Sequence, residues 1–128
     1  LNALGYINAD RGVRLEEALA LIEKAVALEP DNGYYLGSQG WPLYRLNQLD
    51  RAQASLRQAV AKGAEHPVTF DHLADVLSRQ GKLKEALEFW QKALLGKDED
   101  DELDRAAVER KIRDAHAILD GGGKSGKS

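Results

Sequence analysis

The chain has 128 residues, of which 43% are hydrophobic and 30% are charged, and its net charge is −3 at pH 7. This balance is typical of a folded domain, and the lack of a basic excess argues against nonspecific nucleic-acid binding. The chain contains no cysteine, which excludes disulfides, thiolate zinc sites and cysteine catalysis. No apolar run approaches the roughly 20 residues that span a bilayer. There is no Met, not even at position 1, so we expect a processed product or an excised fragment.

A repeat of 34 residues runs through most of the chain. Segments with the pattern Leu-x-x-Ala begin at Leu15, Leu49 and Leu83. The same step relates further sets of positions, which are Ile22, Leu56 and Trp90; Ala25, Ala59 and Ala93; Gly40 and Ala74; and Leu43 and Leu77. A period of this length indicates a stack of small helical units.

Apolar residues within each unit recur at the spacing of an amphipathic helix. The last unit shows this stripe most clearly, with Leu83, Ala86, Leu87, Trp90 and Ala93. Small residues recur where two helices must approach closely; they are Ala18, Ala52 and Ala86. No stretch alternates for long and β-branched residues are few, so strands are not expected.

Turn residues separate the expected helices. Gly12, Asn47 and Gly81 occupy the turns inside the three units, and Gly and Asn are the residues that best tolerate a left-handed backbone. Residues 30–33 (Pro-Asp-Asn-Gly) and 66–67 (His-Pro) lie between units. They are expected to end one helix pair and begin the next.

These positions resemble the tetratricopeptide repeat (TPR) family, in which each 34-residue unit is a pair of helices. The matching residues of the last unit are Phe70, Leu73, Ala74, Leu77, Gly81, Leu83, Ala86, Trp90 and Ala93. The resemblance covers residues 1 to about 95. Residues 1–6, 10–11, 14–18, 40–41 and 43–46 further resemble the last repeats of long bacterial TPR proteins. Some of those are outer-membrane lipoproteins that recruit partner proteins in the envelope.

The resemblance predicts an all-α fold, a right-handed α-solenoid of three TPR helix hairpins plus a C-terminal capping helix. The three units are expected at residues 1–32, 33–66 and 67–96. A charged connector and a capping helix are expected within residues 97–120, the helix running from Leu103 to Leu119. Residues 121–128 (Gly-Gly-Gly-Lys-Ser-Gly-Lys-Ser) are predicted to be a flexible tail.

Three sequence patterns suggest a nucleotide site, a calcium site or a histidine metal site, but each lacks residues or neighbouring elements that such a site requires. The tail matches the P-loop letters, yet a helix precedes it and the chain ends on Ser128, whereas a P-loop joins a strand to a helix. The acidic run from Asp98 has Leu103 where a calcium loop needs Gly. His66, His72 and His116 form no i, i+4 pair. We therefore expect no enzyme activity, no cofactor and no metal.

The better functional signal is the concave face, which in TPR proteins is lined by the first helix of each pair. The resemblance places eight candidate partner-binding residues there: Tyr6, Tyr34, Trp41, Tyr44, Arg45, Asp71, Asp75 and Arg79. Trp, Tyr and Arg are the residue types that most often anchor protein interfaces. Asp71 and Asp75 stand where some TPR proteins carry Lys and Asn to hold a C-terminal carboxylate, so a ligand ending in Glu-Glu-Val-Asp is not expected. Trp41 and Tyr44 could instead simply pack between repeats.

Pro42 departs from the family pattern. An interior Pro removes a backbone hydrogen bond and costs roughly 3 kcal/mol. We therefore expect the helix over residues 33–46 to be kinked or broken near Ser38–Pro42, and Pro42→Ala to raise the melting temperature.

The sequence thus favours non-catalytic recognition of a partner peptide or protein surface in the groove. No nucleic acid and no direct membrane insertion are expected, and the sequence leaves open whether the compartment is a bacterial cytoplasm or an envelope. Two alternatives remain. The chain could be a stacking or self-association module from a longer TPR array, or a nucleotide binder on the strength of the tail alone.

Overall fold

A computed structural model describes residues 14–96 and 102–121. All regular secondary structure in this part of the chain is helical. The first helix expected for the first TPR repeat lies in residues 1–13 and so falls outside the described residues. Connector residues 97–101 and tail residues 122–128 fall outside them too. The chain divides into two compact units between Glu65 and His66.

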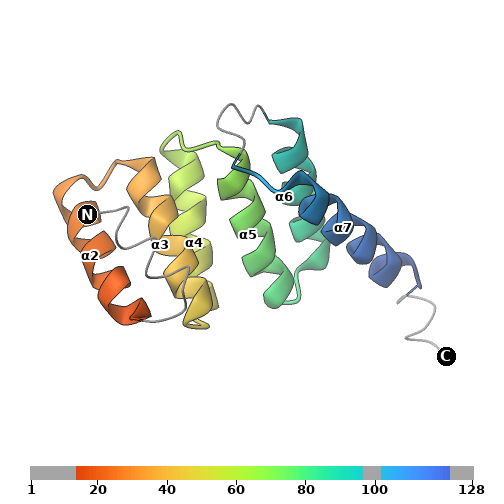
Figure 1. Cartoon of the computed structure of the whole chain (residues 1–128), viewed down its shortest axis with the longest axis horizontal. Helices are drawn as coiled ribbons and strands as arrows, with labels where there is room; N and C mark the ends of the chain where they lie inside the picture. The colour runs from red at the N-terminus through yellow and green to blue at the C-terminus, as the bar shows by residue number, and fades with distance from the viewer. Residues whose placement is uncertain (1–13, 97–101, 122–128) are drawn as a thin grey trace. The chain divides into compact units, whose positions relative to one another are not determined.

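The first unit contains three described helices, α2 (Leu15–Leu28), α3 (Gly33–Arg45) and α4 (Leu49–Ala61). Helix α3 packs against both α2 and α4 (Figure 1). The apolar stripes face inward: Ile22, Leu43 and Leu56 are fully buried. Burial of a side chain of this size stabilises the fold by about 2 kcal/mol, so the contacts between helices hold the unit together.

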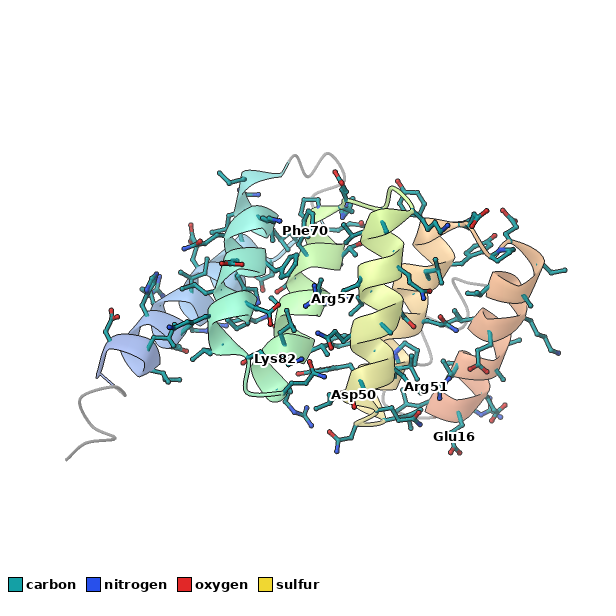
Figure 2. The ribbon with its side chains drawn as sticks, turned by 180° about the vertical axis from the view of Figure 1, so that it is seen from behind. Glu16, Asp50, Arg51, Arg57, Phe70 and Lys82 are labelled. Atoms are coloured by element: carbon teal, nitrogen blue, oxygen red, sulfur yellow. The ribbon has the colours of Figure 1, made fainter. Side chains whose placement is uncertain are left out.

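Close helix approach in the first unit depends on residues without bulk. Ala18 and Ala52 have no exposed surface, as their recurrence at one repeat position predicts. Gly40 on α3 lies against α4, where a Cβ atom would stand 2.5 Å from Leu56 Cγ. Side chains on the solvent face of α4 are charged instead, among them Arg51 and Arg57 (Figure 2).

Two of the three predicted turns, at Asn47 and Gly81, form as the sequence indicates, and the third, at Gly12, falls outside the described residues. Asn32 caps α3, because its side-chain oxygen accepts hydrogen bonds from the backbone N–H groups of Tyr34 and Tyr35 at 3.0 and 3.2 Å. Asn47 has a left-handed backbone with φ of 63°, and Gly81 has φ of 83°. Both residues therefore adopt the left-handed backbone conformation that the turn between two helices requires.

The second unit contains α5 (Pro67–Arg79), α6 (Leu83–Leu95) and α7 (Arg105–His116), followed by a π-helical turn, η1 (Ala117–Gly121). Helix α6 packs against α5 and against α7 (Figure 1). The buried side chains that α5 and α6 contribute are Pro67, Leu73, Ala74, Val76, Leu77, Ala86, Trp90 and Ala93. None of the helices in the described ranges is both long and apolar enough to cross a membrane.

Two helix predictions need correction. Of the two outcomes expected at Pro42, the break is wrong, because α3 runs through Pro42 to Arg45 and the Pro42 ring is buried. A kink at Pro42 stays a prediction. Packing of that ring offsets part of the penalty for the lost backbone hydrogen bond. The last helix begins at Arg105 rather than Leu103, because the Asp104 side chain accepts a hydrogen bond from Ala107 N–H at 3.1 Å and caps it there. Leu103 is buried just ahead of the helix.

Candidate functional site

Helix α3 carries four of the eight candidate residues on one side. Tyr34 lies seven residues before Trp41, a spacing of about two helical turns, and its side chain is 66% exposed. Trp41 and Tyr44 are three residues apart and their rings stack, with centroids 5.2 Å apart and an interplanar angle of 24°. Both are half-buried, and Arg45 beside them is exposed. The helix therefore presents a short aromatic strip that ends in an arginine.

Helix α5 positions the two candidate carboxylates one turn apart. Asp71 and Asp75 are separated by four residues, so their side chains lie on the same face of the helix. Each is largely covered, with side-chain exposures of 16% and 15%. We call these two residues the acidic pair.

Lys111 of α7 bridges the acidic pair. Its Nζ lies 3.1 Å from Asp71 Oδ1 and 3.0 and 3.2 Å from the two carboxylate oxygens of Asp75. Trp90 of α6 completes the arrangement: its indole Nε1 donates a hydrogen bond to Asp75 Oδ1 at 3.2 Å. The Lys111 ammonium also lies 6.0 Å from the centre of the Trp90 ring, at the limit of a cation–π contact.

The electrostatics of this cluster follow from burial and proximity. Burial, and then the neighbouring charge of Asp71, raise the pKa of Asp75 to about 6 from its ordinary 3.8, although Lys111 and Trp90 act in the opposite direction. Burial on its own would lower the pKa of Lys111, but the two carboxylates outweigh it, so that pKa lies above the ordinary 10.5. Lys111 is therefore charged at neutral pH and holds the acidic pair together.

Two candidates belong to neither group. Arg79 is exposed in the last turn of α5. Tyr6 falls outside the described residues. The structure therefore gathers the candidates into an aromatic strip with Arg45 on α3 and the acidic pair on α5.

The sequence interpretation missed Lys111 and the polar role of Trp90. Lys111 comes three residues after the buried Val108 and four before the buried Ala115. A lysine at the edge of an apolar stripe is a signal that its stem packs inward. Trp90 was recognised as a core position from its place in the repeat, and its ring is indeed 4% exposed. Its indole N–H needs an acceptor when buried, which is the signal for a partner such as Asp75.

Two of the three histidines have structural or surface positions. His66 caps α5: its Nδ1 accepts a hydrogen bond from Val68 N–H at 3.1 Å, while its Nε2 lies 3.6 Å from Glu102 Oε1. His116 is exposed at the end of α7. Within residues 14–96 and 102–121, no group of three His, Asp or Glu side chains could hold a metal ion. Of the tail that matches the P-loop letters, only Gly121 is described.

Comparison with known proteins gives one sequence relative and several structural ones. No protein-family model matches the chain. The chain is 48% identical over 68 residues to the TPR repeat-containing protein PA4667 of Pseudomonas aeruginosa. That match covers 53% of the chain but only 12% of the relative, so the chain corresponds to a small part of that protein's length.

Three solved structures have a similar fold. The type III secretion translocator chaperone SycD of Yersinia enterocolitica superposes with a TM-score of 0.81 and 17% identity, covering 93% of this chain and 83% of SycD. The first TPR of Spaghetti (RPAP3) bound to an HSP90 peptide superposes with a TM-score of 0.78 and 18% identity, covering 92% of this chain and 91% of that one. PcrH in complex with the chaperone-binding region of PopD superposes with a TM-score of 0.79 and 18% identity, covering 91% of this chain and 89% of PcrH.

Identities this low support a likeness of fold and not of ligand. The fold likeness agrees with the 34-residue repeat, with the left-handed turns at Asn47 and Gly81, and with the helix hairpins. The recognition made from the sequence is confirmed: the chain has the all-α helical-repeat fold of TPR domains and resembles part of a longer bacterial TPR repeat-containing protein.

Proposed function

We propose that this chain is a non-catalytic protein-interaction module that binds a partner peptide or protein surface through the first helices of its TPR hairpins. The observation that carries this proposal is the aromatic strip on α3. Tyr34 is 66% exposed, and the stacked Trp41 and Tyr44 are only half-buried. Exposed and half-exposed aromatic rings beside an arginine have the composition of an interface hot spot.

The structural relatives support the same class of function. The RPAP3 domain is bound to an HSP90 peptide, and PcrH is bound to a region of PopD. The ligand itself must differ from the HSP90 peptide, whose sequence ends in Glu-Glu-Val-Asp. The carboxylates of Asp71 and Asp75 would repel such an acidic terminus, so a neutral or basic partner segment fits this chain better.

Each candidate residue has a separate role in the proposal. Trp41 and Tyr44 supply apolar contact area at a low cost in side-chain entropy. Arg45 and Arg79 supply charge-assisted hydrogen bonds that set the register of the partner. Tyr6 stays a candidate on the sequence alone. Asp71 and Asp75 already bind Lys111, so they contact a partner only when that lysine moves away.

The proposal is tested by affinity capture with wild type and with the double variant Trp41→Ala/Arg45→Ala. Bound proteins are identified by mass spectrometry, and the affinity of each purified candidate is then measured by calorimetry. We expect a partner that wild type binds and that the double variant loses. Arg57→Ala is the matched control, because it removes the same charge from the exposed face of α4 (Figure 2).

Arg45→Glu is a second variant that protects this test from misfolding. Arg45 is exposed, so its substitution leaves the core intact, and circular dichroism checks that the helix content is unchanged. Reversal of the charge should weaken binding of the same partner. Identical captures from wild type and both variants would contradict the proposal.

A second function follows from the partial match to a longer protein. The 68 matched residues span only 12% of the Pseudomonas relative, so the chain could serve as a stacking unit inside a longer repeat array or associate with itself. Repeat units need neighbours to bury their apolar faces. Light scattering after size exclusion distinguishes the two: a stable dimer in which Trp41 fluorescence is masked favours stacking, and a monomer favours partner binding.

A further inference from the structure

Helix α7 is attached to the α5–α6 hairpin by little apolar surface. Within α7 only Val108 and Ala115 are buried. Ile112 is half-buried, and Leu103 is buried just ahead of the helix. Most other residues of the helix are exposed. By contrast, α5 alone buries Leu73, Val76 and Leu77 along with two smaller residues. Elements with few buried apolar contacts open at a lower free energy than the core that they cover, so α7 should open before α5 and α6 do.

Polar contacts supply much of the remaining attachment. Arg105 donates a hydrogen bond to the backbone oxygen of Leu94 at the end of α6, and Glu102 faces His66 at 3.6 Å. Both lie at the beginning of α7 or just ahead of it. Lys111 makes a contact in the middle of the helix, and this contact reaches α5.

Withdrawal of Lys111 is unfavourable unless another cation replaces it. The acidic pair would otherwise be left as two neighbouring carboxylates, each about 15% exposed and without its positive partner. A buried charge that loses its partner is strongly destabilising. The acidic pair therefore favours exchange of one ammonium group for another over simple opening of α7.

We propose that Lys111 of α7 occupies the acidic pair on α5 as an intramolecular substitute for a partner, and that an amphipathic partner helix bearing a lysine binds the α5–α6 hairpin by displacing α7. This inference rests on the function proposed above and specifies the chemistry of its ligand. Val108, Lys111 and Ala115 define the pattern that the partner should carry: a lysine flanked by small apolar residues three positions before and four after. Charge complementarity with the acidic pair selects the lysine, and burial of Val108 and Ala115 selects apolar neighbours at these two positions.

The test uses the full chain and a synthetic peptide with the sequence of residues 102–121 as the probe. The chain is labelled with ¹⁵N and the peptide is unlabelled, so only amides of the chain are observed. We expect the peptide to move the amide resonances of residues 105–116 toward random-coil positions, while those of α5 and α6 stay dispersed. This measurement needs no substitution in the chain, so it does not depend on how well a variant folds.

Substitution of Lys111 then tests the role of the ammonium group. The Lys111→Met chain should bind the wild-type peptide about tenfold more tightly than the wild-type chain does, because its own α7 competes less well. The same peptide with Lys111→Met should bind at least tenfold more weakly than the wild-type peptide. Lys84→Met on the exposed part of α6 is the control and should leave the affinity unchanged.

Two results would overturn the inference. One is that residues 105–116 keep their resonances at saturating peptide, which would make α7 a permanent cap. The other is equal binding of the wild-type and Lys111→Met peptides, which would remove the lysine from recognition. Neither measurement involves Trp41 or Arg45, so failure here is distinguishable from failure of the capture experiment that tests the proposed function.

Discussion

Gly40 illustrates how a single residue sets the distance between two helices. A Cβ at this position would lie 2.5 Å from Leu56 Cγ and within 2.8 Å of both Leu56 Cδ atoms. Leu56 is completely buried, so it cannot move aside without disturbing the core. Gly40→Ala gains about 1 kcal/mol of helix propensity, but overpacking of a core costs about 1–3 kcal/mol. We expect a net loss of stability of about 1 kcal/mol, measured by urea denaturation.

A double-mutant cycle separates the clash from other effects of the substitution. Leu56→Ala alone should destabilise the protein by several kcal/mol, about 2–5, because it leaves a cavity. Gly40→Ala/Leu56→Ala should be more stable than the sum of the single changes predicts, since the new methyl group then enters the vacated space. Strict additivity would show that the two residues do not compete for the same volume.

Asn47 and Gly81 show that the turn positions are chosen for backbone conformation. Asn47 has φ of 63°, a conformation that costs an ordinary L-residue about 1–2 kcal/mol. We expect Asn47→Ala to be about 1 kcal/mol less stable than Asn47→Gly, as measured by denaturant midpoints at constant m-value. Equal stabilities of the two variants would mean that the turn relaxes to a different backbone conformation.

At the scale of the element, Pro42 is held inside α3 by opposing effects. Proline lacks the N–H that the Ser38 carbonyl would accept in a helix, and the total penalty is about 3 kcal/mol. The buried ring adds two methylene groups relative to Ala, worth about 0.8 kcal/mol each. The balance still favours Ala by about 1 kcal/mol, so Pro42→Ala should raise the melting temperature by about 2–5 °C in a calorimetric scan. An unchanged or lower melting temperature would show that ring packing dominates.

Most element boundaries were within reach of the sequence because they are set by neighbouring residues. The caps at Asn32 and His66 and the left-handed turns at Asn47 and Gly81 each involve contacts over a few positions only. The beginning of α7 was placed two residues too early, since Asp104 caps the helix and Leu103 is buried ahead of it. The continuity of α3 through Pro42 could not be foreseen, because it depends on how the ring packs.

At the scale of the whole molecule, the Lys111 cluster should make stability depend on pH. The pKa of Asp75 is raised to about 6 in the folded state, so protonation of Asp75 adds to the free energy of unfolding. This contribution is fully present below the unfolded pKa of 3.8 and is lost as the pH rises through 6. The raised pKa of Lys111 acts in the same sense above 10.5. From pH 7.5 to pH 5, wild type should therefore gain about 1 kcal/mol relative to Asp75→Asn.

Urea denaturation of both proteins at the two pH values measures this difference, and comparison of two variants cancels the other titrating groups. Asp31→Asn is the control, because the Asp31 side chain is 84% exposed. A carboxyl ¹³C resonance of Asp75 that titrates with a midpoint below 5 would contradict the expected shift. In that case the burial of Asp75 would be weaker than the structure indicates.

The sequence by itself determined the repeat, the helix pairs, the turns and the positions of the buried alanines. All of these follow from periodicity and from short-range backbone preferences, which a linear pattern records. Only the tertiary structure decided that Lys111 sits between Asp71 and Asp75, at separations of 40 and 36 residues. Charge pairs between residues so far apart produce no periodic pattern in the sequence. The sequence alone therefore does not indicate which lysine pairs with which aspartate. The packing of α7 against α6 selected this lysine and so changed two expected ligand contacts into internal ones.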